Sequence, residues 1–174
     1  MDGRPALVFG IDSMASEFSG KPLQLHVFLD HEIFHRYHSQ VTGFSDDNGQ
    51  EEIIWRGLWV EGLATYVSMV LNPPATMQDA LFFPTDLVKR ASPIRSRLAK
   101  QLEGNLDVSD SKIFRKYFSY HIGDADGVPP RSGYYIGLLA SQRLAQQNSL
   151  KELVHLRDDA VRKELGETLT LLAR

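Results

Sequence analysis

The sequence contains no cysteine, and this absence restricts the chemistry that the chain can carry. Disulfide bonds and thiolate metal ligands are both excluded, so any metal site must use histidine, aspartate or glutamate. The absence leaves the cellular compartment open, because a chain without thiols is suited to reducing and oxidising surroundings alike.

Long apolar runs and an excess of charge are also missing. No apolar run approaches the ~20 residues that a membrane-spanning helix needs, so no transmembrane segment is expected. Residues 1–10, MDGRPALVFG, lack a basic start followed by a long apolar stretch, so no signal peptide is visible. The formal net charge of −3 gives no reason to expect nucleic acid as a partner. The basic stretch at 89–100 is interpreted as a solvated helix face.

The chain is long enough to bury one hydrophobic core. Its 174 residues, 43% of them hydrophobic and 24% charged, are typical of a globular protein and favour a single domain over residues 1–174. The oligomeric state and the compartment are not predicted by these features.

Most of the chain is predicted to be helical. Two long helices are expected at 22–40 and 50–71, the second ending before Asn72-Pro73-Pro74. Asn48 and Glu51 have the spacing of a capping box, as do Ser149 and Glu152 later in the chain. Further helical segments are predicted near 75–81, 85–103, 110–119 and 133–147, with a last one opening at 149.

One segment favours a strand. Residues 6–11, ALVFGI, form a short apolar run rich in β-favouring residues. A single strand cannot satisfy its own backbone hydrogen bonds, so its partners are expected upstream of this chain or from elsewhere. The predicted fold class is therefore mostly α (α+β), with a short N-terminal strand and an upstream sheet that is truncated.

The stretch DHEIFHRYH, residues 30–38, is the strongest candidate for a metal site. Residues four apart on a helix share a face, about 6 Å apart along the axis, so His31 and His35 can direct two imidazoles at one ion. Glu32 is rotated about 100° from His31 and can reach a water molecule without being a ligand. The alternative is a polar helix face rich in histidine. His38 lies about 10 Å along the axis from His31, which favours a surface or supporting position.

Glu61 is the candidate third ligand. It lies in the middle of IIWRGLWVEGLATYVSMVL, residues 53–71, a segment that is apolar nearly all round, as in a buried helix. A buried carboxylate is costly unless it is paired or binds a metal. The alternative is an ion pair with Arg56 or Arg131. Gly62 beside it allows a second backbone to approach closely.

HEIFH, WVEGLATY and RSGYYIG together resemble the gluzincin zinc metallopeptidases. They look most like bacterial domains described as predicted zinc-dependent proteases, and more distantly like aminopeptidase N-like enzymes. The resemblance covers about residues 6–165 and implies a zincin-like catalytic domain with Zn²⁺ held by His31, His35 and Glu61. It also implies Glu32 as the catalytic base. Arg36 departs from the pattern, because zinc-protease helices usually have an uncharged residue there.

The resemblance leads us to expect a zinc-dependent peptidase that acts on a peptide or protein substrate. Tyr134 is our first candidate for a donor to the developing oxyanion and Tyr135 the second, although both could simply pack in the core. His121 is a separate candidate, or an ordinary partly buried histidine. By analogy, the predicted strand could align a substrate backbone at residues 7–11.

Two other functions fit the same residues. A zinc hydrolase acting on an ester or a non-peptide amide would use an identical ligand set. A non-catalytic helical binding domain could keep the pattern as a structural or vestigial metal site. Glu32 argues against the second alternative, because a structural zinc site tends to be closed by four protein ligands.

Overall fold

A computed structural model gives the structure of the chain and describes residues 7–43, 52–122 and 125–174. The described residues are mostly helical, and their one β pairing is an isolated antiparallel bridge between Ile53 and Ser109. Two 3₁₀ turns lie at Ser92–Ile94 and Ala125–Gly127. The α-helices, in chain order, are α1 (Ile11–Phe18), α2 (Pro22–Thr42), α3 (Ile54–Leu71), α4 (Met77–Leu81), α5 (Leu87–Ala91), α6 (Arg95–Gly104), α7 (Ser111–Phe118), α8 (Ser132–Leu144), α9 (Leu150–His155) and α10 (Asp158–Leu172).

The mostly helical character predicted from the sequence is confirmed, but the predicted N-terminal strand is wrong. Residues 7–10 have no regular structure, and Ile11 begins α1. The Met14 N–H donates to the Gly10 carbonyl at 3.0 Å, and Asp12 places an acid in the first turn, where the helix dipole favours it. A strand needs a neighbour for its backbone groups, whereas this helix satisfies them within one short segment.

Helix α2 carries the histidine motif; it begins at the predicted residue and extends two residues beyond the predicted end. Pro22 occupies the first turn, where its missing N–H costs no hydrogen bond. The helix ends at Gly43, which has a φ of 75°, and the Gly43 N–H donates to the Ser39 carbonyl at 2.8 Å. Because only glycine adopts this conformation without strain, Gly43 sets the end two residues beyond the predicted limit.

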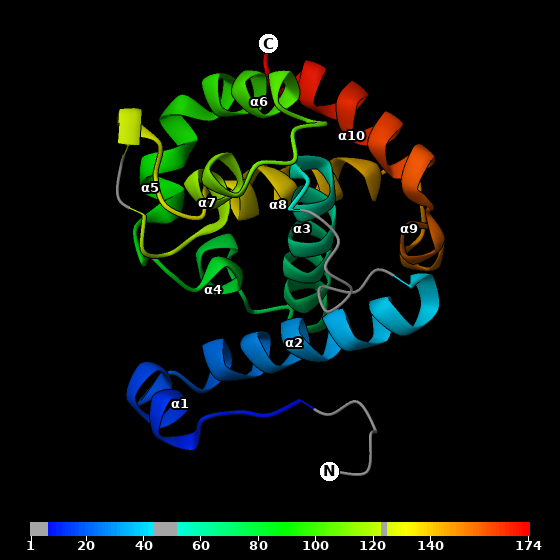
Figure 1. Ribbon diagram of the computed structural model, residues 1–174. Coiled ribbons are helices and arrows are strands. Elements are labelled where there is room, and N and C mark those ends of the chain that lie inside the picture. The colour runs from blue at the N-terminus through cyan, green and yellow to red at the C-terminus, as the bar shows by residue number, and fades with distance from the viewer. Residues whose placement is uncertain (1–6, 44–51, 123–124) are drawn as a thin grey trace.

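Helix α3 is buried along most of its length and lies in the middle of the molecule, with α2 across one end (Figure 1). It ends at Leu71 as predicted but begins at Ile54, later than predicted, because Glu52 and Ile53 lie outside the helix; residues 44–51 lie outside the described residues. The predicted capping box of Asn48 and Glu51 also falls there. Within the described ranges, no helix has both the length and the apolar character needed to cross a membrane.

The shorter helices follow the predicted pattern with two interruptions. Helices α4, α7 and α8 lie where helical segments were predicted, whereas the 85–103 segment is divided into α5 and α6 by the 3₁₀ turn. The last segment, predicted to open at residue 149, is divided into α9 and α10 at Leu156 and Arg157. The capping box at the start of α9 is confirmed. The Ser149 Oγ accepts from the Glu152 N–H at 3.3 Å, and the Glu152 carboxylate accepts from the Ser149 N–H at 2.8 Å.

Two hydrophobic clusters lie on either side of the histidine motif. The larger one is centred on α3 and α8, with side chains from α6 and α10 packed against them. The smaller one joins α1, α2 and α4 through Phe18, Val27, Ala80 and Phe82. Helix α2 contributes to both, through Phe34 and Val27, so its middle turns are fixed from two sides.

Helices α3 and α8 cross in backbone contact at a pair of glycines. A Cβ atom added at Gly62 would lie 2.3 Å from the carbonyl carbon of Gly137, and one added at Gly137 would lie 2.5 Å from the Leu58 oxygen. Any side chain at either position would force the helices apart. The close approach expected at Gly62 is therefore confirmed, and it fixes the turn of α3 that carries Glu61.

We expect Gly62→Ala to lower the free energy of unfolding by about 1–3 kcal/mol, because the added methyl group meets backbone rather than a flexible side chain. Gly104→Ala is the matched control, since nothing lies within 4 Å of a Cβ there. This control is expected to leave the stability unchanged or to raise it by up to about 1 kcal/mol. Urea denaturation followed by circular dichroism measures both. Equal stability of the two variants would contradict the close helix contact.

Candidate metal centre

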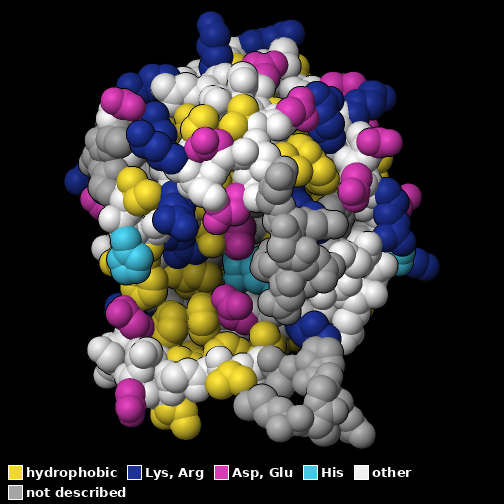
Figure 2. All heavy atoms as spheres, viewed as in Figure 1, with side chains coloured by type: hydrophobic (Ala, Val, Ile, Leu, Met, Phe, Trp, Pro, Cys, Tyr) yellow, Lys and Arg dark blue, Asp and Glu magenta, His cyan; other side chains and the backbone are white. Residues whose placement is uncertain are grey.

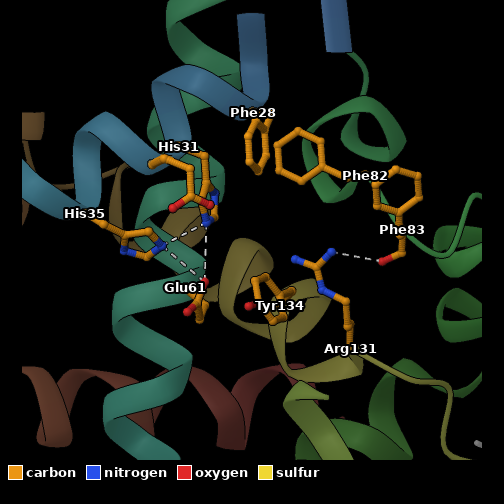
Figure 3. A pocket seen from close by; sticks show the side chains of 9 residues that line it. Phe28, His31, His35, Glu61, Phe82, Phe83, Arg131 and Tyr134 are labelled. Atoms are coloured by element: carbon orange, nitrogen blue, oxygen red, sulfur yellow. Dashed lines mark hydrogen bonds and ion pairs between the residues drawn. The ribbon is translucent and has the colours of Figure 1, made fainter. Parts of the chain in front are cut away.

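Helices α2 and α3 bring three potential metal ligands together. The Nε2 atoms of His31 and His35 lie 2.9 Å apart, and each lies 3.3 Å from the Glu61 Oε2 atom. Figure 3 shows the two imidazoles pointing from α2 toward the carboxylate on α3. This is the convergence that the sequence predicts for one ion, and the three residues form the candidate metal centre.

The triangle of ligand atoms has dimensions that suit zinc. Bonds of about 2.0–2.1 Å at tetrahedral angles place neighbouring ligand atoms about 3.3 Å apart. The two distances to Glu61 match this value, and the distance between the imidazoles is shorter by a few tenths of an ångström. His35 and Glu61 keep 18% and 20% of their side chains exposed, so the cluster is open to solvent on one side. Three protein ligands and an open side are typical of a catalytic zinc site.

The electrostatics of the cluster favour the protonation states that a metal needs. Burial, followed by the neighbouring His35, lowers the pKa of His31 to about 4, so its imidazole is neutral at pH 7. Burial alone would raise the pKa of Glu61, but His35 and His31 together hold it well below its usual range. A neutral imidazole and an ionised carboxylate are the forms that bind divalent metals.

A cleft of about 200 Å³ opens beside the candidate metal centre. Figure 2 shows this face of the molecule hollowed, with apolar side chains along one wall and histidine and acidic side chains near its centre. Glu32 lines the cleft beside the two histidines, as expected for a base that acts on water without being a ligand. The other lining residues are Phe28, Phe82, Phe83, Arg131 and Tyr134.

Tyr134 is the tyrosine that reaches the candidate metal centre. It lies in the first turn of α8, and its ring stacks on the His31 ring with the centroids 6.4 Å apart. Burial, reinforced by the Glu61 carboxylate, raises the pKa of Tyr134 above its ordinary value, so the phenol keeps its proton. A protonated phenol can donate a hydrogen bond into the cleft. Tyr135, by contrast, is buried in the larger hydrophobic cluster and does not line the cleft.

The other histidines of the sequence lie away from the candidate metal centre. His38 is 1% exposed and stacks on Phe34 with the ring centroids 5.4 Å apart, so a surface position for it is wrong. Burial lowers its pKa to about 4. His121 is exposed and lines a neighbouring pocket rather than the cleft.

Arg131 does not form the ion pair with Glu61 that was the alternative interpretation of the sequence. Its Nη1 atom donates to the carbonyl oxygens of Leu81 at 3.4 Å and Phe83 at 3.2 Å, and its guanidinium carbon lies 3.9 Å from the centre of the Tyr134 ring. The Glu61 carboxylate faces the two histidines instead. Arg131 is therefore part of the cleft wall.

Sequence reasoning missed the aromatic wall of the cleft. Phe82 and Phe83 belong to the connection after α4, and nothing in the local pattern indicates that they face the histidine motif. Phe82 and Arg131 both have positive φ angles, 55° and 58°, which are strained for residues with a side chain. Such conformations concentrate at functional sites, and here both residues line one cleft.

Comparisons with known protein families, with curated proteins and with solved structures found no match. Functional inference for this chain therefore depends on the geometry of the cluster and on the chemistry of its side chains.

We expect His35→Ala and Glu61→Ala to weaken zinc binding by more than about 100-fold, since loss of even a supporting residue around a zinc site costs about 10- to 100-fold. His26→Ala is the matched control, because His26 lies on the exposed side of the same helix. Zinc content after dialysis, and competition with a chromophoric chelator, measure the effect. Wild-type affinity in Glu61→Ala would contradict the three-ligand site.

Proposed function

We propose that this chain is a zinc-dependent peptidase of the gluzincin type, with a zincin-like catalytic domain. The observation that carries the proposal is the convergence of two imidazole nitrogens and one carboxylate oxygen within 2.9–3.3 Å of one another, at a cleft that Glu32 also lines. The HEIFH spacing, the glutamate on the following helix and the tyrosine at the start of α8 support the same assignment.

The proposed ligands are His31, His35 and Glu61. When bound there, a zinc ion would polarise the scissile carbonyl and lower the pKa of a water molecule to about 7. Glu32 accepts a proton from the attacking water and passes it to the leaving nitrogen. Its position next to a ligand in sequence, but about 100° around the helix, keeps it free for this proton transfer.

Tyr134 completes the proposed site from the opposite side. Its phenol keeps its proton and lies close to Glu61, so it can donate a hydrogen bond to the carbonyl oxygen as negative charge develops there. The ring is held between the His31 imidazole and the Arg131 guanidinium, which limits its freedom to turn. A donor that is already in place costs little reorganisation during the reaction.

Glu32→Gln is expected to keep the zinc ion but to lower peptide hydrolysis by at least about 100-fold, because a glutamine cannot accept the proton of the attacking water. The measurements are zinc content and initial rates on a mixture of short peptides followed by mass spectrometry. Glu167→Gln makes the same chemical change on the exposed side of α10 and is expected to have no effect. Wild-type rates in Glu32→Gln, or hydrolysis of esters without any peptide hydrolysis in the wild type, would refute the proposal.

Tyr134→Phe is expected to lower kcat by about 100-fold with little change in KM, since the lost hydrogen bond forms mainly in the transition state. Tyr135→Phe is the matched control, because it removes a tyrosine hydroxyl from the next residue, whose side chain packs in the core. It should leave kcat within a factor of about two. Steady-state kinetics on the best peptide substrate separates the two. An equal loss in both variants would point to a general effect on folding and against a donor role for Tyr134.

A further inference from the structure

Arg131 is a cationic side chain that lines the cleft, and it is held in a defined position. Its Nη1 atom donates to two backbone carbonyls, and its guanidinium lies on the Tyr134 ring. It lines both the cleft and an adjacent pocket of about 470 Å³, so it marks the junction of the two spaces. In Figure 3 its guanidinium lies between Tyr134 and Phe83, at the side of the cleft away from His35.

The guanidinium retains the capacity to bind an anion. Both carbonyl contacts are made by Nη1, and a guanidinium has five N–H donors, so these contacts leave donors for a further acceptor. The planar group matches a carboxylate in a bidentate geometry. Because the side chain is already ordered by its contacts, binding a carboxylate there costs little conformational entropy.

The described charges that line the cleft favour a negatively charged group of the substrate near Arg131. Among the described residues that line the cleft, Glu32 and Glu61 are the acids and Arg131 is the basic residue apart from the histidines. A divalent cation held by the candidate ligands would compensate these two acids and leave the Arg131 charge for a carboxylate of the substrate.

The position of Arg131 limits how far that carboxylate can lie from the scissile bond. The Tyr134 ring centre is 6.4 Å from the His31 ring centre and 3.9 Å from the Arg131 guanidinium carbon. The guanidinium is therefore no more than about 10 Å from the imidazole, and part of that distance is taken up by the contacts at each end. Since an extended chain spans about 3.3–3.6 Å per residue, the gap accommodates one or two residues.

The wall beside Arg131 is apolar. Phe28 and Phe82 meet with their ring centroids 5.6 Å apart, and Phe83 continues the wall toward the adjacent pocket. An aliphatic or aromatic side chain next to the bound carboxylate would bury its surface against these rings.

We propose that Arg131 binds the C-terminal carboxylate of the substrate, and that the cleft accepts peptides that end in an apolar residue. Hydrolysis adds one water molecule across the last or the penultimate peptide bond, giving a shortened peptide and a free amino acid or dipeptide. This inference rests on the proposed peptidase function and adds the substrate class. An acidic side chain of the substrate also presents a carboxylate, and the first test distinguishes it from the C-terminal carboxylate.

The first test compares three peptides on the zinc-loaded protein: acetyl-Ala-Ala-Ala-Phe with a free carboxylate, its C-terminal amide, and the amide of acetyl-Ala-Ala-Asp-Phe. We expect kcat/KM for the free acid to exceed that for its amide by about 10- to 100-fold, the range for a hydrogen-bonded charged group. If the aspartyl amide is hydrolysed as fast as the free acid, Arg131 binds an acidic side chain of the substrate, and the C-terminal assignment is overturned. Equal rates for the acid and its amide would overturn it as well.

Arg131→Met should abolish the preference for the free acid. Arg131→Lys should retain part of it, because lysine keeps the positive charge but lacks the planar pair of N–H donors. Arg97→Met is the matched control, since the Arg97 Nη2 also donates to a backbone carbonyl, that of Gly127 at 2.8 Å, outside the cleft. This control should keep the full preference. If Arg131→Met does not fold, the lysine variant and the wild-type comparison of acid with amide still decide.

A binding experiment separates this inference from the peptidase proposal. Acetyl-phenylalanine and its amide are titrated into zinc-loaded wild type and Arg131→Met by calorimetry, which needs no hydrolysis. Binding of the acid at least about 10-fold tighter than the amide, lost in Arg131→Met, supports the carboxylate site even if no peptide is cleaved. A preference that persists in Arg131→Met, or is absent from the wild type, overturns the inference, whether or not peptides are hydrolysed.

Discussion

The contact of the Glu61 carboxylate with the His31 and His35 imidazoles is the interaction on which the candidate site depends. It places an ionised carboxylate inside a largely apolar helix bundle, which is costly unless that charge is compensated. The imidazoles compensate it in part, and a divalent cation would do so more fully. The same contact couples α2 to α3, so that the two helices with the proposed ligands cannot shift independently.

The surrounding packing explains why this contact has a defined geometry. The crossing of α3 and α8 at Gly62 and Gly137 leaves no space for adjustment, and it fixes Glu61 along one helix and Tyr134 along the other. Helix α2 is held by a separate cluster around Phe82. A site assembled from rigid helices, rather than from loops, keeps its ligands within the few tenths of an ångström that metal binding requires.

The cleft combines a polar centre with an apolar and cationic wall, and this division suggests how it could select a substrate. The proposed ligands and the proposed base lie on α2 and α3, and the proposed donor Tyr134 lies across the cleft on α8. Arg131 and Phe83 lie toward the adjacent pocket, whereas Phe28 is on α2 and Phe82 packs against His31. Chemistry and selection would thus share elements, because α2 carries Phe28 as well as the histidines, and Tyr134 on α8 directly follows Arg131 and Ser132-Gly133 in the chain.

Sequence alone determined the parts of the site that depend on helix geometry. The spacing of His31 and His35 places them on one face of any helix, and the apolar surroundings of Glu61 indicate a buried carboxylate, so the three were identified together. The predicted strand at residues 6–11 was wrong because strand formation depends on contacts outside the segment itself. Apolar β-favouring residues predict a strand only where a neighbour is available, and residues 7–10 remain irregular before α1 begins.

Only the tertiary structure decided what faces the histidine motif. Phe82, Phe83 and Arg131 reach the cleft because α4 packs beside α2 and α8 packs against α3, and Tyr134 rather than Tyr135 does so because the close approach of α8 to α3 sets its rotation. No local periodicity encodes these placements. They follow from packing between segments that are far apart in the chain, whereas the ligand spacing follows from hydrogen bonds within a single helix.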